Sequence, residues 1–426
     1  MTDSFSDKLE RRQAELVEKC TQCGDCFKVC PMTEPAGLQD SDPALVTNGI
    51  IEFLTKNRTL LEAKRWAEVC SGSGTCIPVC QHGVNPRFML SLVRLRQLEA
   101  DQTINSHRQG GEAFSAMSRG VRILSQLQLS PELQAQLHTE RVRSEPPEVI
   151  FYTGCQVLKT PHIALLCLDM LDALNVDYEV FGGPRDCCGV LQYRTGDVPV
   201  SGRIGNRTTE RFRATGTKRV LSWCPTCQVQ LGENLLPEAR EDLADDAFSL
   251  IPFVCYLAEN LESLKPLLVN PVQKKVGLHE HPGVGGVTEA ARSLLEAIPG
   301  LQYIDLQQPR VGWMCNTLQP LPEYKRRVHS DLLTAAAEAG VDTLAGVYHA
   351  CHRELCSHER DWPFDVVNFL ELVGESMGLF REDRFKRLKI LGDIDSVMVE
   401  VGDQALKLGM DLDQVRKVLA KDLLGQ

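Results

Sequence analysis

The 426-residue sequence contains few aromatic residues, 6% of the total, although 43% of its residues are hydrophobic. It has no apolar stretch of the eighteen or so residues that a helix needs to span a bilayer, which excludes a membrane-spanning chain. Its polar start, MTDSFSDKLERRQ, lacks the apolar core of a secretory signal. We therefore expect a globular, cytoplasmic protein with two or three domains, each burying its own core.

The sequence also contains fewer basic than acidic residues. The formal net charge is −11, and Lys and Arg do not cluster into a long basic run. A phosphate backbone and an anionic membrane surface both need such a run. We expect no nucleic acid partner.

Cysteine, by contrast, is abundant, with 17 residues in the chain. In a protein that is not exported, cysteines serve as metal ligands or redox thiols more often than as disulfides. The spacing of these cysteines is therefore the main evidence for function.

The first cysteine run has the spacing C-x2-C-x2-C-x3-C-P over residues 20–31. This pattern places three thiolates on one tight loop around a cubane iron–sulfur cluster and directs the fourth toward a neighbouring cluster. A zinc site usually takes two separated C-x2-C pairs, so iron is favoured. The ligands in this run are Cys20, Cys23, Cys26 and Cys30.

The second run repeats this frame over residues 70–80, with Ser73 in place of the second cysteine and Gln81 in place of the proline. The crossing rule for two-cluster proteins predicts a complete [4Fe-4S] site and an incomplete site. The complete set is Cys20, Cys23, Cys26 and Cys80, and the incomplete set is Cys30, Cys70 and Cys76. The incomplete site would hold a [3Fe-4S] cluster, which we favour, or a [4Fe-4S] cluster whose last iron binds Ser73, water or an external ligand, or nothing.

A third group of cysteines follows three predicted strands, at Val149–Tyr152, Tyr178–Phe181 and Arg219–Trp223. Loops at the carboxyl ends of parallel strands converge on one crevice, so these thiols are expected to meet. Gly154 and Gly189 would let the backbone approach a bulky inorganic group. The members of this group are Cys155, Cys187, Cys188, Cys224 and Cys227.

The pattern of elements predicts an α+β fold with a helical, ferredoxin-like two-cluster domain, a duplicated α/β region and a helical C-terminal tail. We predict five segments. They are a ferredoxin-like domain at 1–100, a helical linker at 101–147, a first α/β unit at 148–264, a second at 265–378 and a tail at 379–426.

The third cysteine group resembles the signature of the heterodisulfide reductase family, C-x(31–39)-C-C-G-x(35–36)-C-x2-C, also called the CCG domain. Cys155, Cys187, Cys188, Gly189, Cys224 and Cys227 meet it residue by residue. The whole chain is similar to a ferredoxin-like HdrC part fused ahead of an HdrB part, as in HdrD and DsrK. The resemblance implies that these five cysteines hold one noncubane [4Fe-4S] cluster, with Cys187 and Cys188 at the catalytic centre.

The second α/β unit departs from the signature. His279 and His281 stand where its first cysteine is expected, Met314-Cys315-Asn316 replaces Cys-Cys-Gly, and Cys351 is followed by Glu354 instead of a cysteine. A second noncubane cluster is therefore not expected. His279, His281, His349, His352 and His358 are candidate ligands for another metal, but histidines on strand-end loops are more often surface or structural residues. Cys167 and Cys255 are expected to be small core residues.

Together these features predict an iron–sulfur oxidoreductase subunit. It would pass electrons between a partner and the noncubane cluster, which would act on a disulfide or thiol. The alternative is an electron-transfer subunit of a flavin dehydrogenase of the glycolate, lactate or glycerol-phosphate type; a scaffold or redox sensor is a third reading. Expected partners are a flavoprotein or a membrane quinone or cytochrome subunit, and a sulfur-carrier protein or thiol. The protein would be free in the cytoplasm or attached through a partner to the inner membrane face.

Overall fold

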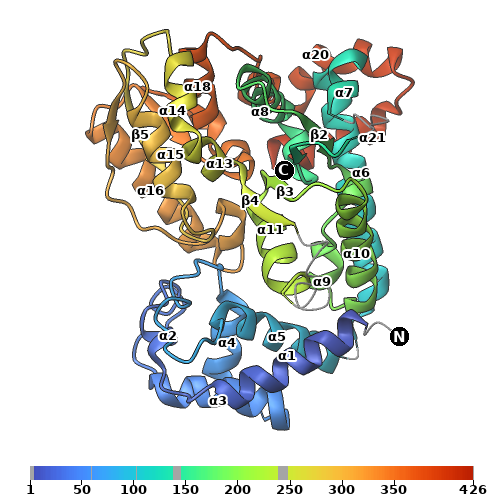
Figure 1. The fold of residues 1–426 in the computed structure, drawn as a ribbon, viewed down its shortest axis with the longest axis vertical. Coiled ribbons are helices and arrows are strands. Elements are labelled where there is room, and N and C mark those ends of the chain that lie inside the picture. The colour runs from blue at the N-terminus through green and yellow to red at the C-terminus, as the bar shows by residue number, and fades with distance from the viewer. Residues whose placement is uncertain (1–3, 59, 102, 138–144, 238–247, 426) are drawn as a thin grey trace.

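The computed structural model of the chain describes residues 4–58, 60–101, 103–137, 145–237 and 248–425. It combines helices with two parallel sheets, as the sequence predicted. In Figure 1 the N-terminal helices form one end of the molecule, and the two sheet-containing units lie side by side above them. The C-terminal helices lie beside the first of these units. Residues 138–144 of the predicted linker and 238–247 of the first unit fall outside the described ranges.

The N-terminal part is helical, and its longer helices begin at capping residues. Ser4 and Asp7 form a capping box at the start of the first helix. Asp42 and Asn85 each cap a helix whose first residue is proline, where the missing N–H costs no hydrogen bond. The helices are α1 (Phe5–Lys19), α2 (Asp25–Lys28), α3 (Pro43–Lys56), α4 (Leu61–Val69) and α5 (Pro86–Ala100).

The first sheet has the strand order β2-β1-β3-β4, and all its neighbouring strands are parallel. Its strands are β1 (Val149–Tyr152), β2 (Tyr178–Phe181), β3 (Arg219–Ser222) and β4 (Ser249–Pro252). Parallel strands need crossover connections, and helices supply them here. These are η1 (Gln156–Lys159), α8 (Pro161–Ala173), η2 (Pro184–Asp186), α9 (Val190–Arg194), α10 (Val198–Ala214), α11 (Pro225–Val229) and η3 (Gln230–Leu235). After the last strand of this sheet come α13 (Phe253–Glu259), α14 (Leu261–Leu264) and η4 (Lys265–Leu267).

The second sheet repeats this arrangement with the order β6-β5-β7-β8, again all parallel. Its strands are β5 (Lys275–His279), β6 (Gln302–Ile304), β7 (Thr343–Gly346) and β8 (Asp365–Asn368). The same relative strand order in both sheets agrees with the predicted duplication. The helices of this unit are α15 (Val287–Glu296), η5 (Cys315–Leu318), α16 (Pro322–Glu338), α17 (His349–Leu355), η6 (Cys356–Arg360) and α18 (Phe369–Met377).

The sequence pattern did not reveal the last strand of either sheet. Both β4 and β8 are edge strands of four residues, and none of the residues of β4 is fully buried. An edge strand has one partner only and carries a weak apolar signal; β4 even ends in Pro252, which a central strand does not tolerate. These strands were therefore missed for one physical reason.

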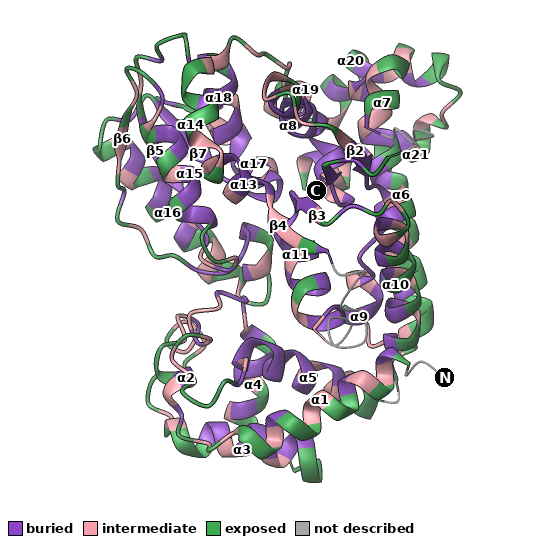
Figure 2. Ribbon diagram, viewed as in Figure 1, coloured by how far each residue is buried: buried purple, intermediate pink, exposed green. Residues whose placement is uncertain are grey.

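The first sheet is buried on both faces, and alternate residues of β1 point to different cores. Val149 and Phe151 belong to a core that continues into the second sheet through residues such as Leu344. Ile150 and Tyr152 belong to another core that they share with the N-terminal helices. This follows from the two-residue period of a strand. The first sheet thus lies between the other two parts of the molecule. Every residue of β1 is buried, whereas Figure 2 shows the edge strand β4 as only partly buried.

The predicted linker and the predicted tail pack against each other. The linker contains α6 (Ser106–Gln128) and α7 (Pro131–Gln136), and the tail contains α19 (Arg384–Ile390), α20 (Ile394–Lys407), α21 (Leu412–Val418) and η7 (Leu419–Leu424). Leu124 and Leu127 of α6 form a small separate core with Phe385, Val401 and other tail residues. The tail is therefore attached through an apolar interface to the linker helix.

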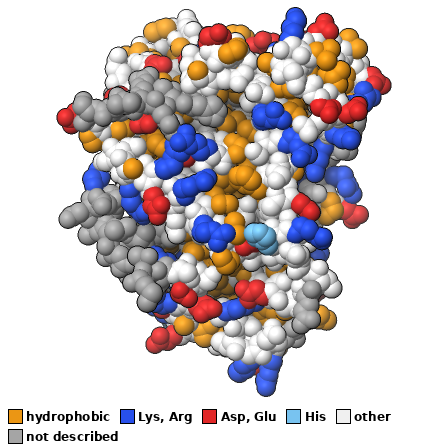
Figure 3. Space-filling view, turned by 90° about the vertical axis from the view of Figure 1, so that its right-hand side faces the viewer, with side chains coloured by type: hydrophobic (Ala, Val, Ile, Leu, Met, Phe, Trp, Pro, Cys, Tyr) orange, Lys and Arg blue, Asp and Glu red, His pale blue; other side chains and the backbone are white. Residues whose placement is uncertain are grey.

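The surface carries charges of both signs. On the face shown in Figure 3, acidic and basic side chains are interspersed, and apolar side chains lie between them. Among the described residues, no helix is both long and apolar enough to cross a membrane.

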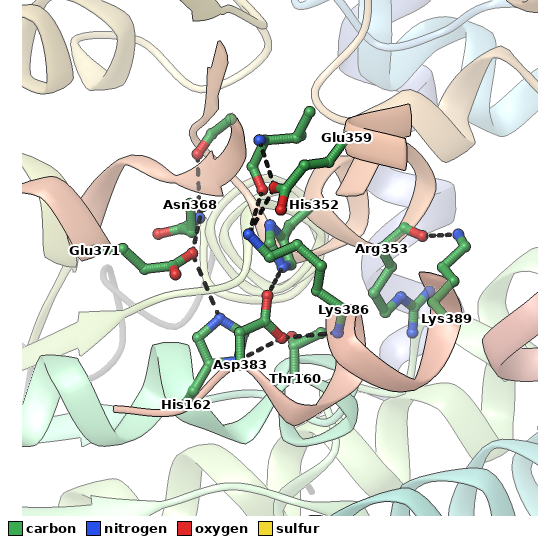
Figure 4. A network of polar contacts seen from close by, with 12 residues as sticks. Thr160, His162, His352, Arg353, Glu359, Asn368, Glu371, Asp383, Lys386 and Lys389 are labelled. Atoms are coloured by element: carbon green, nitrogen blue, oxygen red, sulfur yellow. Dashed lines mark hydrogen bonds and ion pairs between the residues drawn. The ribbon is translucent and has the colours of Figure 1, made fainter. Parts of the chain in front are cut away.

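A buried network of histidines and carboxylates joins both α/β units to the tail (Figure 4). His352 of α17 lies 2.6 Å from a carboxylate oxygen of Asp383, which caps α19. His162 of α8 lies 3.4 Å from the other oxygen of Asp383 and 3.7 Å from Glu371 of α18. Burial alone would lower the pKa of His162, but the two carboxylates outweigh it and raise that pKa. Burial also opposes ionisation of Asp383, yet His162 and His352 hold its pKa well below the ordinary value.

These shifts predict a stability window for the network. A lowered pKa at Asp383 stabilises the fold above its ordinary value of 3.8 and loses this effect as the pH falls. A raised pKa at His162 stabilises the fold below 6.5 and loses this effect as the pH rises. Asp383→Asn should lower the free energy of unfolding by about 1–3 kcal/mol, most strongly between about pH 4 and 6.5.

Urea unfolding of the variant and the wild type across this pH range measures the difference. Asp403→Asn, at an exposed position of α20, is the matched control and should change stability little. Equal losses in the two variants at every pH would contradict the role assigned to the network.

Candidate iron–sulfur sites

The first predicted cluster site is assembled at one end of the N-terminal helices. Its four predicted ligands line one small pocket, together with Thr47 and Met89. Gly24 makes the tight loop between Cys23 and Cys26 feasible, because its φ is +81° and a Cβ would lie 2.5 Å from Pro43. Burial, followed by the charges of neighbouring cysteines, raises the pKa of Cys26 to about 12. The predicted ligands that line the pocket are Cys20, Cys23, Cys26 and Cys80.

The second predicted site contains Cys30, Cys70 and Cys76, which also lie close enough to influence one another. Burial, followed by the charge of Cys70, raises the pKa of Cys30 to about 11. Burial raises the pKa of Cys76 further, with Cys70 and Cys30 adding to the effect. Buried thiols of this kind lose their protons when a metal binds them, so the donor set fits an iron–sulfur cluster.

Ser73, at the position of the missing cysteine, is engaged with the protein. Its hydroxyl accepts a hydrogen bond of 2.7 Å from the backbone N–H of Gly312 and lies 3.1 Å from the hydroxyl of Ser71. Gly312 belongs to the second α/β unit. The serine therefore ties the loop of the incomplete site to a part of the chain far away in the sequence.

The third predicted site brings all five cysteines of the CCG signature together at the carboxyl ends of β1, β2 and β3. The Cys155 sulfur lies 3.1 Å from the carbonyl oxygen of Gly183, and Gly189 donates its N–H to Cys187 at 3.5 Å. Gly154 has a φ of +70°, which favours glycine, and a Cβ there would lie 3.1 Å from the Cys227 sulfur. Every one of the five is at most 7% exposed.

Hydrogen bonding within this group separates the pKa values of its thiols. Contacts with Cys155 and Cys188 lower the pKa of Cys187 well below its ordinary value, and the same contacts, together with burial, raise the pKa of both partners. A contact with Cys227 likewise lowers the pKa of Cys224. Five converging, buried thiols without a disulfide are a suitable donor set for a polynuclear iron cluster. The assignment of that cluster stays a prediction.

A cavity of about 290 Å³ lies between the second and third predicted sites. Cys70 lines it on one side, and Val190 and Thr226, which neighbour the CCG cysteines, line it on another. Trp313 of the second unit also lines it and donates its indole N–H to Thr226 at 3.2 Å. Sequence reasoning missed this cavity because its lining residues are distributed over three parts of the chain.

Two arginines bring positive charge to this cavity and have no carboxylate partner among the described residues. Arg94 donates to the carbonyl oxygens of Ala67 and Cys70, both at 3.2 Å. Arg194 is exposed and makes no hydrogen bond or ion pair within the described part of the chain. Glu68 and Glu233 line the cavity as well, and Glu233 pairs with Arg87. With three arginines and two glutamates, the lining carries one more positive than negative charge.

The second CCG-like unit brings together histidines and cysteines of its incomplete motif. His279 and His281 lie beside Cys315 and Cys351, and one ligand atom from each lies within 4.8 Å of the others. The sequence predicted that such histidines are more often surface or structural residues. His279 and His281 are only 6% and 2% exposed, so the surface role is wrong for these two. His349 and His352 are also buried, and His358 is half-buried. The burial of these histidines could not be predicted from the sequence, because a loop covered by neighbouring helices has no characteristic sequence pattern.

Comparison with known proteins agrees with the motifs. Residues 16–84 match the 4Fe-4S dicluster domain, and residues 149–232 match the cysteine-rich domain called CCG. The D subunit of the dihydromethanophenazine:CoB–CoM heterodisulfide reductase of Methanosarcina mazei is 22% identical over 411 residues, which cover 85% of this chain and 94% of the relative. Its counterpart in Methanosarcina barkeri is 22% identical over 404 residues with the same coverage.

Another relative is the B subunit of the fumarate reductase (CoM/CoB) of Methanothermobacter marburgensis, 24% identical over 377 residues, covering 83% of this chain and 71% of the relative. No solved structure matches the chain. The chain thus belongs to the class of proteins that combine an iron–sulfur dicluster domain with a CCG domain, and these relatives are subunits of oxidoreductases. Within that class it resembles the D subunit of heterodisulfide reductase over most of its length.

The loop of the second site offers a test of how the sites are held in place. Gly72 has a φ of +75°, and a Cβ there would lie 1.9 Å from the Trp313 ring. Gly83 has a similar φ of +68°, but a Cβ there would have no other atom within 4 Å. Both Gly→Ala variants carry about 1–2 kcal/mol of backbone strain, and Gly72→Ala adds a clash with the indole ring.

We expect Gly72→Ala to lower the thermal midpoint more than Gly83→Ala and to reduce the iron content, because the loop that carries Cys70 and Cys76 must move. Thermal unfolding and iron analysis of both variants measure this. A thermal midpoint and an iron content that match between the two variants would show that the contact with Trp313 does not hold the loop.

Proposed function

We propose that this protein is an iron–sulfur oxidoreductase subunit that reduces or forms a disulfide at the CCG cysteines and exchanges electrons with a partner protein through the N-terminal sites. The observation that carries the proposal is the cavity of about 290 Å³ between Cys70 and the CCG cysteines. None of the five CCG cysteines lines it, but Val190 and Thr226 do, so a substrate bound there would lie beside the segments that carry Cys188, Cys224 and Cys227. The similarity to the D subunit of heterodisulfide reductase supports the reaction class.

The stoichiometry of disulfide reduction determines how many electrons and protons must reach the site. Reduction of a disulfide consumes two electrons and two protons and yields two thiols, and the reverse reaction releases them. A noncubane cluster held by Cys155, Cys187, Cys188, Cys224 and Cys227 would supply an iron for substrate sulfur and a store for electrons. The redox partner protein is the source or the acceptor of the electrons.

The residues of the chain would bind and orient the substrate. Arg94 and Arg194, which pair with no carboxylate in the described ranges, can bind a carboxylate, sulfonate or phosphate of the substrate. Apolar side chains such as Phe88 and Leu95 would contact its carbon chain. The substrate class that fits is therefore a small anionic thiol or disulfide.

A second candidate is an electron-transfer subunit without sulfur chemistry of its own, serving a flavin dehydrogenase. The observation that favours it is the incomplete second CCG motif, where Glu354 pairs with Lys325 at 2.6 Å instead of presenting a thiol. Co-purification of a flavoprotein, together with no effect of thiols on the clusters, would support this candidate over the first.

Replacement of Cys187 tests the leading proposal. Cys187 lies at the centre of the thiol group, so Cys187→Ala should abolish disulfide turnover with a reduced dye as electron donor. The N-terminal sites lie elsewhere and should keep their iron and their low-temperature paramagnetic signals. Wild-type protein purified without oxygen should contain about eleven or twelve irons per chain, and the variant about four fewer.

The matched control is Cys167→Ala, because Cys167 is fully buried in α8 away from the sites. It should keep both the iron content and the turnover. Retained turnover in Cys187→Ala would refute the proposal. A wild-type iron content of only about seven or eight per chain would leave the CCG cysteines without a cluster and refute it as well.

The substrate class is tested with two thiols of similar size, the anionic 2-mercaptoethanesulfonate and the neutral 2-mercaptoethanol. Both should perturb the paramagnetic spectrum of the oxidised protein if they reach the CCG site. Arg194→Gln should raise the half-saturating concentration of the anionic thiol by about tenfold or more, because a charge-assisted contact contributes about 1.5–3 kcal/mol. The neutral thiol should respond alike in variant and wild type.

Arg207→Gln, on the outer side of α10, serves as the control and should leave both titrations unchanged. An equal change for both thiols in Arg194→Gln would mean that the arginine shapes the cavity and does not recognise charge.

A further inference from the structure

We propose that the second α/β unit binds one structural Zn²⁺ ion through His279, His281, Cys315 and Cys351. This site goes beyond the iron–sulfur sites described above and does not depend on the proposed reaction. The residues occupy positions in the second sheet that correspond to those of the CCG cysteines in the first.

The correspondence follows the strand order. Cys155, Cys188 and Cys224 follow β1, β2 and β3, whereas His279 ends β5, Cys315 follows β6 and Cys351 follows β7. The carboxyl ends of these parallel strands meet at one edge of the sheet. The same topology that collects five thiols in the first unit therefore collects two thiols and two imidazoles in the second.

The distances between the donor atoms suit one metal ion. His279 Nε2 lies 3.1 Å from the Cys315 sulfur, and His281 Nε2 lies 3.7 Å from the same sulfur. One ligand atom from each of the four residues lies within 4.8 Å of all the others. A tetrahedral zinc ion with bonds of about 2.0–2.3 Å places its ligand atoms about 3.3–3.8 Å apart. Small side-chain adjustments would close this set around a single ion.

Hydrogen bonding to neighbouring groups orients one of the imidazoles for metal binding. Nδ1 of His281 lies 2.7 Å from the carbonyl oxygen of Val311 and donates its proton to that oxygen. The lone pair of Nε2 is then free and faces Cys315. Metal-binding histidines almost always use the second ring nitrogen in this way.

The carboxylate of Glu280, the residue between the two histidines, contacts other side chains. It pairs with Arg292 and Arg310 and accepts a hydrogen bond from Tyr303. Successive residues at the end of a strand alternate in direction, so His279 and His281 share one side. Another carboxylate, that of Glu354, lies within 4.8 Å of the Cys315 sulfur together with His329, but it pairs with Lys325 at 2.6 Å. The proposed site is therefore built from two histidines and two cysteines.

The ligand set points to zinc among the common metals. Two thiolates and two imidazoles in a closed, buried site match structural zinc sites, which have four protein ligands and no open position. Zinc does not change its oxidation state, so such an ion would hold the ends of β5, β6 and β7 together without carrying electrons. It would also fix the segment from Val311 to Cys315, which includes Trp313 at the cavity.

The test is metal analysis of the full chain, purified without oxygen and dialysed against a chelator to remove surface-bound ions. We expect one zinc per chain in addition to the iron, and zinc X-ray absorption that shows two sulfur and two nitrogen neighbours. Zinc below stoichiometric amounts, a shell of four sulfurs, or iron in place of zinc would each overturn the proposal.

Variants locate the ion. Cys351→Ala and His281→Ala should lose the zinc, whereas Cys356→Ala and His358→Ala should keep it. The last two change the next cysteine and a nearby histidine of the same stretch, outside the ligand set. Zinc retained in both ligand variants would refute the site. If a ligand variant does not fold, the absorption spectrum of the wild type still decides.

Discussion

The three parts of this molecule meet at one buried guanidinium, that of Arg87. From α5 it donates to the carbonyl oxygens of Gly72 and Gly283 at 2.7 and 2.5 Å, and it pairs with Glu233 in the first α/β unit. Only 6% of Arg87 is exposed. A buried arginine is costly unless its donors are satisfied, and leaving one uncompensated costs about 3–5 kcal/mol. The hydrogen-bond donors of Arg87 are therefore satisfied only when all three parts of the molecule are packed together.

This constraint places the sites next to one another. Gly72 belongs to the loop between Cys70 and Cys76, Glu233 follows the CCG cysteines on η3, and Gly283 follows His281. The planar, five-donor shape of arginine allows one side chain to reach all three, which lysine could not do. Trp313, which lines the cavity, has its ring centroid 5.8 Å from the guanidinium carbon of Arg87. The cavity thus exists because this junction holds the three parts against one another.

Much of this arrangement could be predicted from the sequence, because strong local signals mark it. The cysteine spacings and the three strands that precede the CCG cysteines are encoded within short stretches of chain, and the comparisons bear out the dicluster and CCG domains. What could not be predicted depends on contacts between distant residues. The pairing of Arg87 with Glu233, the shared cores on both faces of β1 and the burial of His279 and His281 have no local pattern. The edge strands β4 and β8 were missed because half-buried edges carry little apolar periodicity.

The duplicated sheets show how one topology supports two kinds of site. In each unit the carboxyl ends of the strands lie at one edge of its own sheet. The first unit places five thiols at this edge, and the second places two thiols and two imidazoles there. Thiolates bridge and hold polynuclear iron, whereas a mixed set of two sulfurs and two nitrogens surrounds a single ion. If the second set takes zinc, redox chemistry is confined to the first unit and the N-terminal sites, which face each other across the cavity. The loss of cysteines in the second unit would then leave its structural role intact while removing its capacity to carry electrons.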